Sequence, residues 1–267
     1  MTPTRTRRQT RARGDRAMRT RREQNRITRI LPGAMILLLA AAGAQGQQNF
    51  DVTMTADNAY AIYFGDEFSA TVQLGWAENT TPTMIWSTES YSLTIPDSSW
   101  IYIAAWSDDA VKQGVLADFT NLTLGGQVLS GNTPWEVAAT GVDLDDGALP
   151  PSLATMTTEI LNANAGVNPS VGWVTPAASP LDNLAGGIHA VTISGIDDDA
   201  RWMWYDSGMD TTSANPPFTV PSVPIGFNHD EFLIFRIPVE APEPATMAML
   251  GVGGLGLLRR RRRAGGR

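Results

Sequence analysis

Short apolar runs separated by turn-forming residues dominate the chain from Asp51 to about Thr140. The runs are rich in β-branched and aromatic side chains, and Gly, Asn, Asp, Ser and Pro stand between them, as between consecutive β-strands. In Tyr91–Ile95 apolar and polar residues alternate, so this strand has one dry face and one wet face. The predicted strands are Val52–Thr55, Tyr60–Phe64, Ala70–Trp76, Thr83–Trp86, Tyr91–Ile95, Trp100–Trp106, Gly114–Thr120 and Trp135–Thr140.

The second half reads differently, because Gly and Pro break residues 141–187 repeatedly. Within that stretch only Ser152–Ala163 has the composition of a short helix. Two further strands, Ile188–Ser194 and Arg201–Tyr205, precede a Pro-rich loop, and a last strand, Glu231–Val239, closes the body. Short strands with turn signals and at most one short helix predict an all-β fold, a single antiparallel β-sandwich of jelly-roll-like architecture.

Charge divides the 267-residue chain into an acidic body and two basic ends. Of the 20 basic residues, 11 are arginines between Arg5 and Arg29, and six lie between Arg259 and Arg267. The body, residues 47–240, holds three cations against 24 acids, a net charge of −21. Such a body repels nucleic acid and anionic lipid. Cysteine is absent and there are two histidines, which excludes disulfides, thiolate catalysis and cysteine zinc sites.

The first 46 residues have the layout of a secretory signal peptide. A basic run leads into the apolar stretch Ile30–Ala42, and small residues follow it. We expect cleavage after Ala44, or after Gly46. The apolar stretch is too short to span a bilayer comfortably, and Met18 opens a leader of more ordinary length, so Met1 and Met18 are both candidate starts.

Residues 241–267 combine three elements in a fixed order. The motif Pro242, Glu243 and Pro244 comes first, and the apolar stretch Thr246–Leu258 follows. At about 1.5 Å per residue, this stretch is too short as a helix for a hydrocarbon core of roughly 30 Å. An arginine cluster comes next and consists of Arg259, Arg260, Arg261, Arg262 and Arg263. Arginines flank both terminal apolar segments on the side away from the body, so the positive-inside rule leaves both ends cytoplasmic and the body outside.

This order of elements resembles the PEP-CTERM sorting signal of Gram-negative and related bacteria. The resemblance implies a membrane-embedded cysteine transpeptidase, exosortase, as the partner that cuts near Pro-Glu-Pro during transient contact with the inner membrane. It also implies export to the cell surface or extracellular matrix, among proteins of biofilm and polysaccharide systems. The segment Asn58–Phe119 is similar to the β-sandwich bodies of such carriers. The alternative is a plain C-terminal anchor helix with a stop-transfer cluster, which differs in whether the bond near Pro244 is cut.

Aromatic side chains gather on one face of the predicted strand Trp100–Trp106. Trp100, Tyr102 and Trp106 share a face there, and aliphatic residues occupy the other. Because aliphatic residues normally fill a core, we expect the aromatic face to offer a stacking platform for the apolar C–H faces of sugar rings. The alternative is a central strand buried on both sides.

Clustered acids suggest a weak calcium site. Asp143 and Asp145 lie in one turn-like segment, and Asp197 and Asp199 lie in another. Calcium prefers several carboxylate and carbonyl oxygens on a turn, although neither cluster has EF-hand spacing. Solvated turn carboxylates are the alternative. No other cofactor is implied.

The sequence predicts an exported, non-enzymatic surface or matrix protein with a role in adhesion or polysaccharide association. No nucleophile elbow, zinc-protease helix or phosphate-binding loop occurs in it. Two alternatives stay open: a secreted carbohydrate-active hydrolase, which needs only two suitably spaced carboxylates, and a purely structural, calcium-braced surface protein.

Overall fold

Alternating burial along the first strand fixes which way it faces. In β1 (Gln47–Asp57), every second side chain from Gln48 to Ala56 is buried, as expected for one face packed on a core. The computed structural model describes residues 46–78, 86–107, 114–132, 134–144, 147–187, 191–207 and 231–240. Within these residues the chain forms two antiparallel sheets and one helix, so the predicted all-β sandwich is confirmed.

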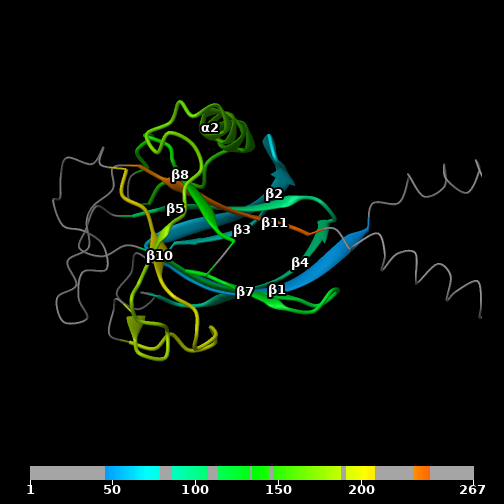
Figure 1. Ribbon diagram of the computed structural model, residues 1–267, viewed down its shortest axis with the longest axis vertical. Helices are drawn as coiled ribbons and strands as arrows, with labels where there is room; N and C mark the ends of the chain where they lie inside the picture. Colours follow the sequence, from blue (N-terminus) through cyan, green and yellow to red (C-terminus); the bar gives the residue numbers. More distant parts are fainter. Residues whose placement is uncertain are drawn as a thin grey trace, which may run out of the picture. The chain divides into compact units, whose positions relative to one another are not determined.

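The two sheets face one another across the main core (Figure 1). The first sheet has the order β4-β1-β6-β10-β9, with β7 also paired to β6, and the second has the order β3-β2-β5-β11-β8. The first sheet comprises β1, β4 (Glu89–Pro96), β6 (Gly114–Asn121), β7 (Gln127–Leu129), β9 (Ala177–Ala178) and β10 (Met203–Trp204). The second comprises β2 (Ala59–Asp66), β3 (Ser69–Glu78), β5 (Trp100–Trp106), β8 (Glu136–Ala139) and β11 (Leu233–Pro238). The main core lies between them and is filled by side chains such as Val52, Ile103, Phe119 and Phe235.

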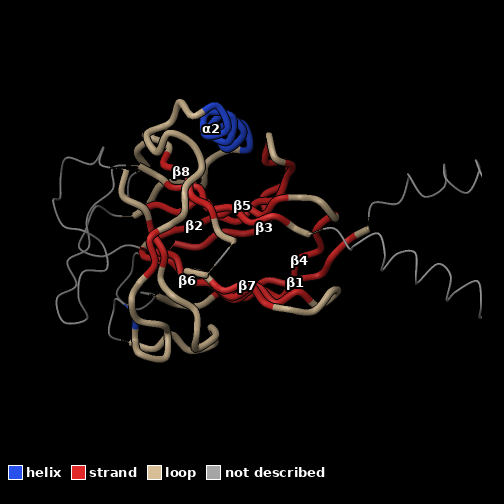
Figure 2. The backbone as a smooth tube through the Cα atoms, in the orientation of Figure 1, coloured by secondary structure: helices blue, strands red, loops and turns tan. Residues whose placement is uncertain are grey.

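Helix α2 (Leu153–Ala165) covers the outer face of the second sheet (Figure 2). It begins after Ser152, whose hydroxyl accepts the N–H of Thr155, and it ends at Gly166, which has a left-handed φ of 66°. Its buried face includes Met156 and Ile160, spaced at one helical turn. These side chains form a second apolar cluster with the outer residues of β2 and β5, with Phe232 and with Ile234 of β11.

The irregular segment before β10 covers the outer face of the first sheet. Asn183 is fully buried there; its side-chain amide donates to the carbonyls of Ile193 and Ile196, and its Oδ1 accepts the N–H of Ile193. Ile193 packs with Leu116 of β6 in a third apolar cluster. The Asn183 side chain therefore bonds the backbone around Ile193 and Ile196, where no strand pairing is present.

One strand prediction needs correction, and another lies mostly outside the described residues. Of Ile188–Ser194, residues 188–190 lie outside the described part, and residues 191–194 form no strand because Asn183 takes up the backbone groups of Ile193. Of Thr83–Trp86, only Trp86 is described, and it lies in a turn. The predicted last strand is β11, which lies between β5 and β8.

Candidate functional site

The expected aromatic platform on β5 lies under helix α2. Tyr102 and Trp106 are buried in the cluster with Met156 and Ile160, and only Trp100 is partly exposed. The structure therefore corrects the expectation of an open face made of all three rings, because the helix covers the strand face that bears them. Contact of Trp100 with a ligand stays a prediction.

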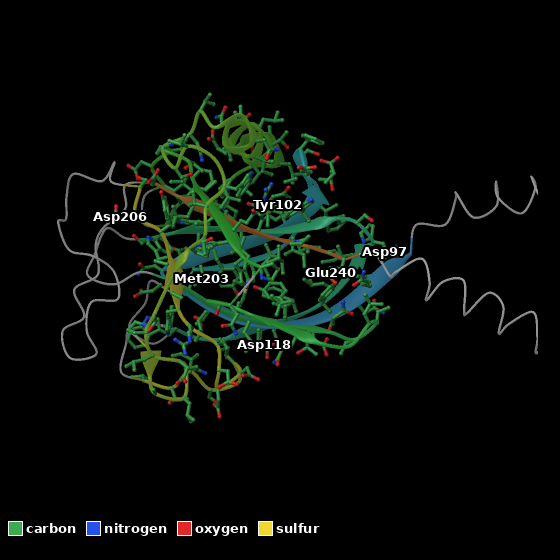
Figure 3. The ribbon with its side chains drawn as sticks, in the orientation of Figure 1. Asp97, Tyr102, Asp118, Met203, Asp206 and Glu240 are labelled. Carbon is green, nitrogen blue, oxygen red and sulfur yellow. The ribbon has the colours of Figure 1, made fainter. Side chains whose placement is uncertain are left out.

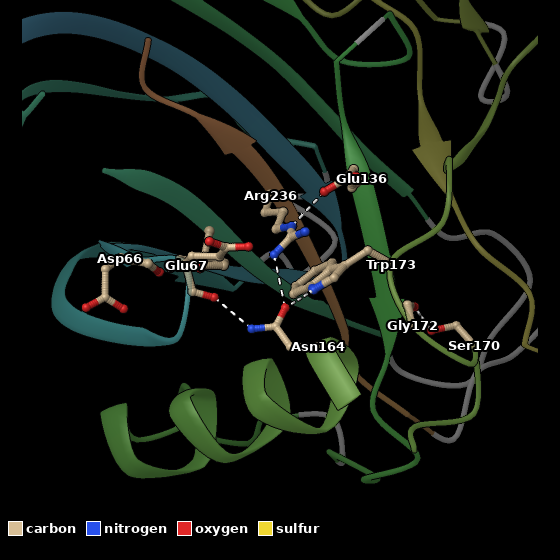
Figure 4. A network of polar contacts seen from close by, with 9 residues as sticks. Asp66, Glu67, Glu136, Asn164, Ser170, Gly172, Trp173 and Arg236 are labelled. Carbon is tan, nitrogen blue, oxygen red and sulfur yellow. Dashed lines mark hydrogen bonds and ion pairs between the residues drawn. The ribbon is translucent and has the colours of Figure 1, made fainter. Parts of the chain in front are cut away.

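Trp100 instead forms one side of a cation–π stack. The guanidinium carbon of Arg236, on β11, lies 4.3 Å from the ring centroid of Trp100 and 3.8 Å from that of Trp173. Arg236 Nε also donates to Glu136 Oε2 on β8, at 2.7 Å (Figure 4). The Arg236 side chain is only 8% exposed, so two rings and one carboxylate compensate the loss of its hydration.

Asn164 links this stack to helix α2 and to the β2–β3 hairpin. Its Oδ1 accepts the indole N–H of Trp173 at 2.7 Å and Arg236 Nη1 at 3.4 Å, and its Nδ2 donates to the carbonyl of Glu67 at 2.8 Å (Figure 4). The asparagine lies in the last turn of the helix, two residues before the Gly166 cap. The Asn164 amide thus bonds the loop that carries Trp173, strand β11 and the β2–β3 hairpin.

The β2–β3 hairpin is held in a defined turn. Asp66 Oδ1 accepts the N–H of Phe68 and the hydroxyl of Ser69, and the Tyr102 hydroxyl donates to the carbonyl of Asp66 at 2.6 Å. The bonds to its side chain, first that from the N–H of Phe68 and then that from Ser69, lower the pKa of the Asp66 carboxyl. Burial raises the pKa of the Tyr102 phenol, which stays a neutral donor. The turn leaves Phe68 58% exposed.

These groups surround a pocket of about 590 Å³ at the surface. It lies where the hairpin, the C-terminal end of α2, the loop before Trp173 and strand β11 meet. Its lining consists of Glu67, Phe68, Ala163, Asn164, Ala165, Gly166, Val171, Gly172, Trp173 and Arg236. Two aromatic rings, a carboxylate, an amide and a guanidinium thus meet at one hollow, a combination that suits a ligand with both apolar faces and hydroxyl groups.

The loop that carries Trp173 is attached to the end of strand β8 by side-chain hydrogen bonds. Asn168 Nδ2 donates to the carbonyl of Ala139 at the end of β8, and Asn168 Oδ1 accepts the N–H of Gly172. Ser170 accepts the N–H of Ala139 and donates to the carbonyl of Gly172. The backbone beside Trp173 is therefore attached to the sheet before any ligand arrives.

The predicted calcium residues are not gathered into one site. Asp143 is exposed, and Asp145 lies outside the described residues. Asp197 Oδ1 accepts the N–H of Asp199, and Asp197 Oδ2 accepts Gln127 Nε2. Within the described residues, no three acidic or histidine side chains are arranged to hold a metal ion.

The residues of this pocket gave only faint signals in the sequence. Arg236 is one of three cations in the acidic body and occurs inside an apolar strand, which is an unusual place for a charge. Trp173 lies in a stretch broken by Gly and Pro, so no periodicity assigns it to a face. Asn164 and Glu67 resemble ordinary surface residues until the hairpin and the helix meet.

The last described residues of the body are followed by a known signal. Residues 240–263 match the family model of the PEP-CTERM protein-sorting motif. The body of the chain is thus an all-β sandwich, and the match shows that the chain carries a sorting signal consistent with an exosortase substrate. The signal implies export and a surface or extracellular location. Neither the curated proteins nor the solved structures include a match to the chain.

All of the predicted sorting residues lie outside the described part of the chain. This holds for Ala44, for Pro242, Glu243 and Pro244, and for the arginine cluster from Arg259 to Arg263. In the part that is described, no helix has the length and apolar character needed to cross a membrane.

Proposed function

We propose that this is an exported, non-enzymatic surface protein that associates with extracellular polysaccharide through the pocket beside Trp173. The sorting motif supports the location, since its carriers are exported. The observation that carries the binding proposal is the pocket itself, where Phe68 and Trp173 supply rings and Glu67, Asn164 and Arg236 supply polar groups. Sugar rings stack their C–H faces on aromatic side chains and bond their hydroxyls to such planar groups.

The charge balance favours a neutral polysaccharide. Arg236 is already paired with Glu136, and Glu67 adds a carboxylate to the lining. The net charge of −21 on residues 47–240 repels polyanions. A polymer of neutral sugars therefore meets the pocket without an electrostatic penalty.

The test is depletion of the protein from solution by insoluble polysaccharides, comparing Phe68→Ala with Trp76→Ala. Both side chains are exposed aromatics, at 58% and 43%, but Trp76 lies on β3 outside the pocket. Loss of one stacking ring weakens binding by about tenfold, so Phe68→Ala reduces retention and Trp76→Ala does not. Equal retention of both variants, or no retention of the unaltered protein, refutes the proposed role.

Two added measurements, of reducing ends and of the melting temperature, separate the two alternatives. Release of reducing ends from the offered polymer identifies a hydrolase, for which Glu67 in the pocket lining and Glu136 bonded to Arg236 are the candidate carboxylates. A melting temperature that rises with calcium and falls with a chelator supports the calcium-braced structural protein instead. Polymer retention that is unaffected by calcium, with no reducing ends, supports the binding module.

A further inference from the structure

Both ends of the sandwich body meet at one buried side chain. Gln48 lies on the core-facing side of β1, at the end of the sandwich, and is fully buried. Its Nε2 donates to Asp97 Oδ1 at 2.9 Å and to the carbonyl of Glu240, and its Oε1 accepts Asn121 Nδ2 at 2.6 Å. Figure 3 shows Asp97 and Glu240 at the same end of the sheets, away from Met203. The chain therefore enters and leaves the body at one place.

The two terminal apolar segments begin close to this place along the chain. Five residues separate Ala42 from Gln48, and five separate Glu240 from Thr246. The six steps along the chain that five intervening residues make span at most about 22 Å when extended. While either apolar segment is in the membrane, the Gln48 end of the body is thus held within about that distance of the bilayer.

Two exposed leucines lie at this end, on the turn between β6 and β7. Leu122 is 57% exposed and Leu124 is 45% exposed. The turn is bonded directly to the residue after Gln48, since the N–H of Leu122 donates to the carbonyl of Asn49 and Thr123 Oγ1 accepts the N–H of Asn49.

The turn is also rigidly attached. Asn121 Oδ1 accepts the N–H groups of Thr123 and Leu124, at 3.0 and 2.9 Å, while its Nδ2 bonds Gln48. Asn121 therefore connects the buried Gln48 side chain to the turn that carries the two leucines. Gly125 completes the turn at a φ of 77°, with open space around it.

We propose that the Leu122–Leu124 turn contacts the lipid bilayer while the sorting signal holds the protein at the membrane. No positive side chain is needed, because the tether keeps the turn at high local concentration beside the lipid and the leucines supply apolar area. Two leucines alone are too small an anchor to retain a strongly acidic body after the tether is cut. The contact seats the body during processing and is lost on release.

The proposal rests on membrane attachment through the C-terminal signal and is independent of the polysaccharide pocket. Because the chain has no cysteine, a single introduced cysteine can carry an apolar fluorophore at a chosen position. The full chain is placed in phosphatidylcholine vesicles that contain spin-labelled lipid, and quenching of the fluorophore by that lipid is measured. The positions are Leu124→Cys at the turn, Val142→Cys as the control and Met249→Cys in the apolar segment. Val142 is a matched control, since it is 37% exposed and follows β8 at the opposite end of the sheets.

We expect strong quenching at positions 124 and 249 and at least threefold weaker quenching at position 142. Adding Leu122→Ser to the Leu124→Cys chain reduces the quenching at 124 severalfold, because the remaining leucine of the turn is removed. Quenching at 249 without quenching at 124 overturns the proposed lipid contact and leaves the sorting role intact. Absence of quenching at 249 overturns both, and equal quenching at 124 and 142 overturns the proposed orientation.

Discussion

Replacing Gln48 by alanine tests whether one side chain stabilises the place where the chain enters and leaves the sandwich body. The substitution removes two bonds between neutral groups, to Asn121 and to the Glu240 carbonyl, and one bond to the Asp97 carboxylate. Neutral bonds contribute about 1 kcal/mol each and a bond to a charged group contributes about 1.5–3 kcal/mol. Asp97 and Asn121 are partly exposed and regain water after the truncation, which lowers the expected loss to about 3 kcal/mol.

The assay is urea unfolding followed by the fluorescence of the eight tryptophans. Gln127→Ala is the matched control, because Gln127 also donates to two carboxylates, those of Asp118 and Asp197, but is exposed. We expect the control to lose no more than about 0.5 kcal/mol. A loss below about 1 kcal/mol for Gln48→Ala, or an equal loss for both variants, refutes the reasoning.

An isosteric variant adds a pH signature to the same test. Gln48→Glu places a second carboxylate against Asp97 and removes the donor that bonds the Glu240 carbonyl. The free energy of unfolding should therefore fall further than in Gln48→Ala at pH 8. It should recover as the pH falls toward about 4, because protonation of the introduced carboxyl group removes its charge and restores a donor.

Three further variants test other parts of the structure. Asn183→Ala should lower the free energy of unfolding by about 3 kcal/mol, since it leaves buried backbone groups without partners, and hydrogen exchange should rise in residues 191–200 before the sheets open. Asp118→Asn should raise the urea midpoint of unfolding at pH 7 but not at pH 3. Burial raises the pKa of Asp118 above 3.8, so its ionisation costs stability as the pH rises from about 4. Equal midpoints of the two proteins at pH 7 would contradict this. Arg236→Lys should lower the free energy of unfolding by about 2 kcal/mol and change the near-ultraviolet circular dichroism. The reason is that an ammonium group cannot stack between Trp100 and Trp173 while it bonds Glu136. Unchanged spectra would show that the stack is not formed in solution.

The sequence was most informative where a local rule and the tertiary environment agree. The bounds of β5 were predicted at both ends, and Ser152 marked the start of the helix because a serine hydroxyl caps the first turn. Strands β7 and β9 were missed because three and two residues are too few to show an alternating pattern. Ile193 looked like a strand residue, but a distant asparagine, Asn183, satisfies its backbone.

The candidate site could be predicted only in part. Trp100 was selected for its aromatic face, and the structure places it in the stack with Arg236, next to the pocket. The burial of Tyr102 and Trp106 depends on where α2 packs, and a helix of weak amphipathicity does not reveal which sheet face it will cover. Contacts such as that of Asn164 with Glu67, 97 residues apart, exist only after folding.

The most direct test of the central claim is the intact mass of the protein recovered from outside its native cells, with and without the sorting transpeptidase. We predict that the recovered protein begins just after Ala44 and ends near Pro242–Pro244 when the transpeptidase is present. We also predict that the C-terminal segment with its arginine cluster is retained when the transpeptidase is absent. Recovery of the same uncut C-terminus in both strains would contradict sorting by this signal and would identify the segment as a plain anchor.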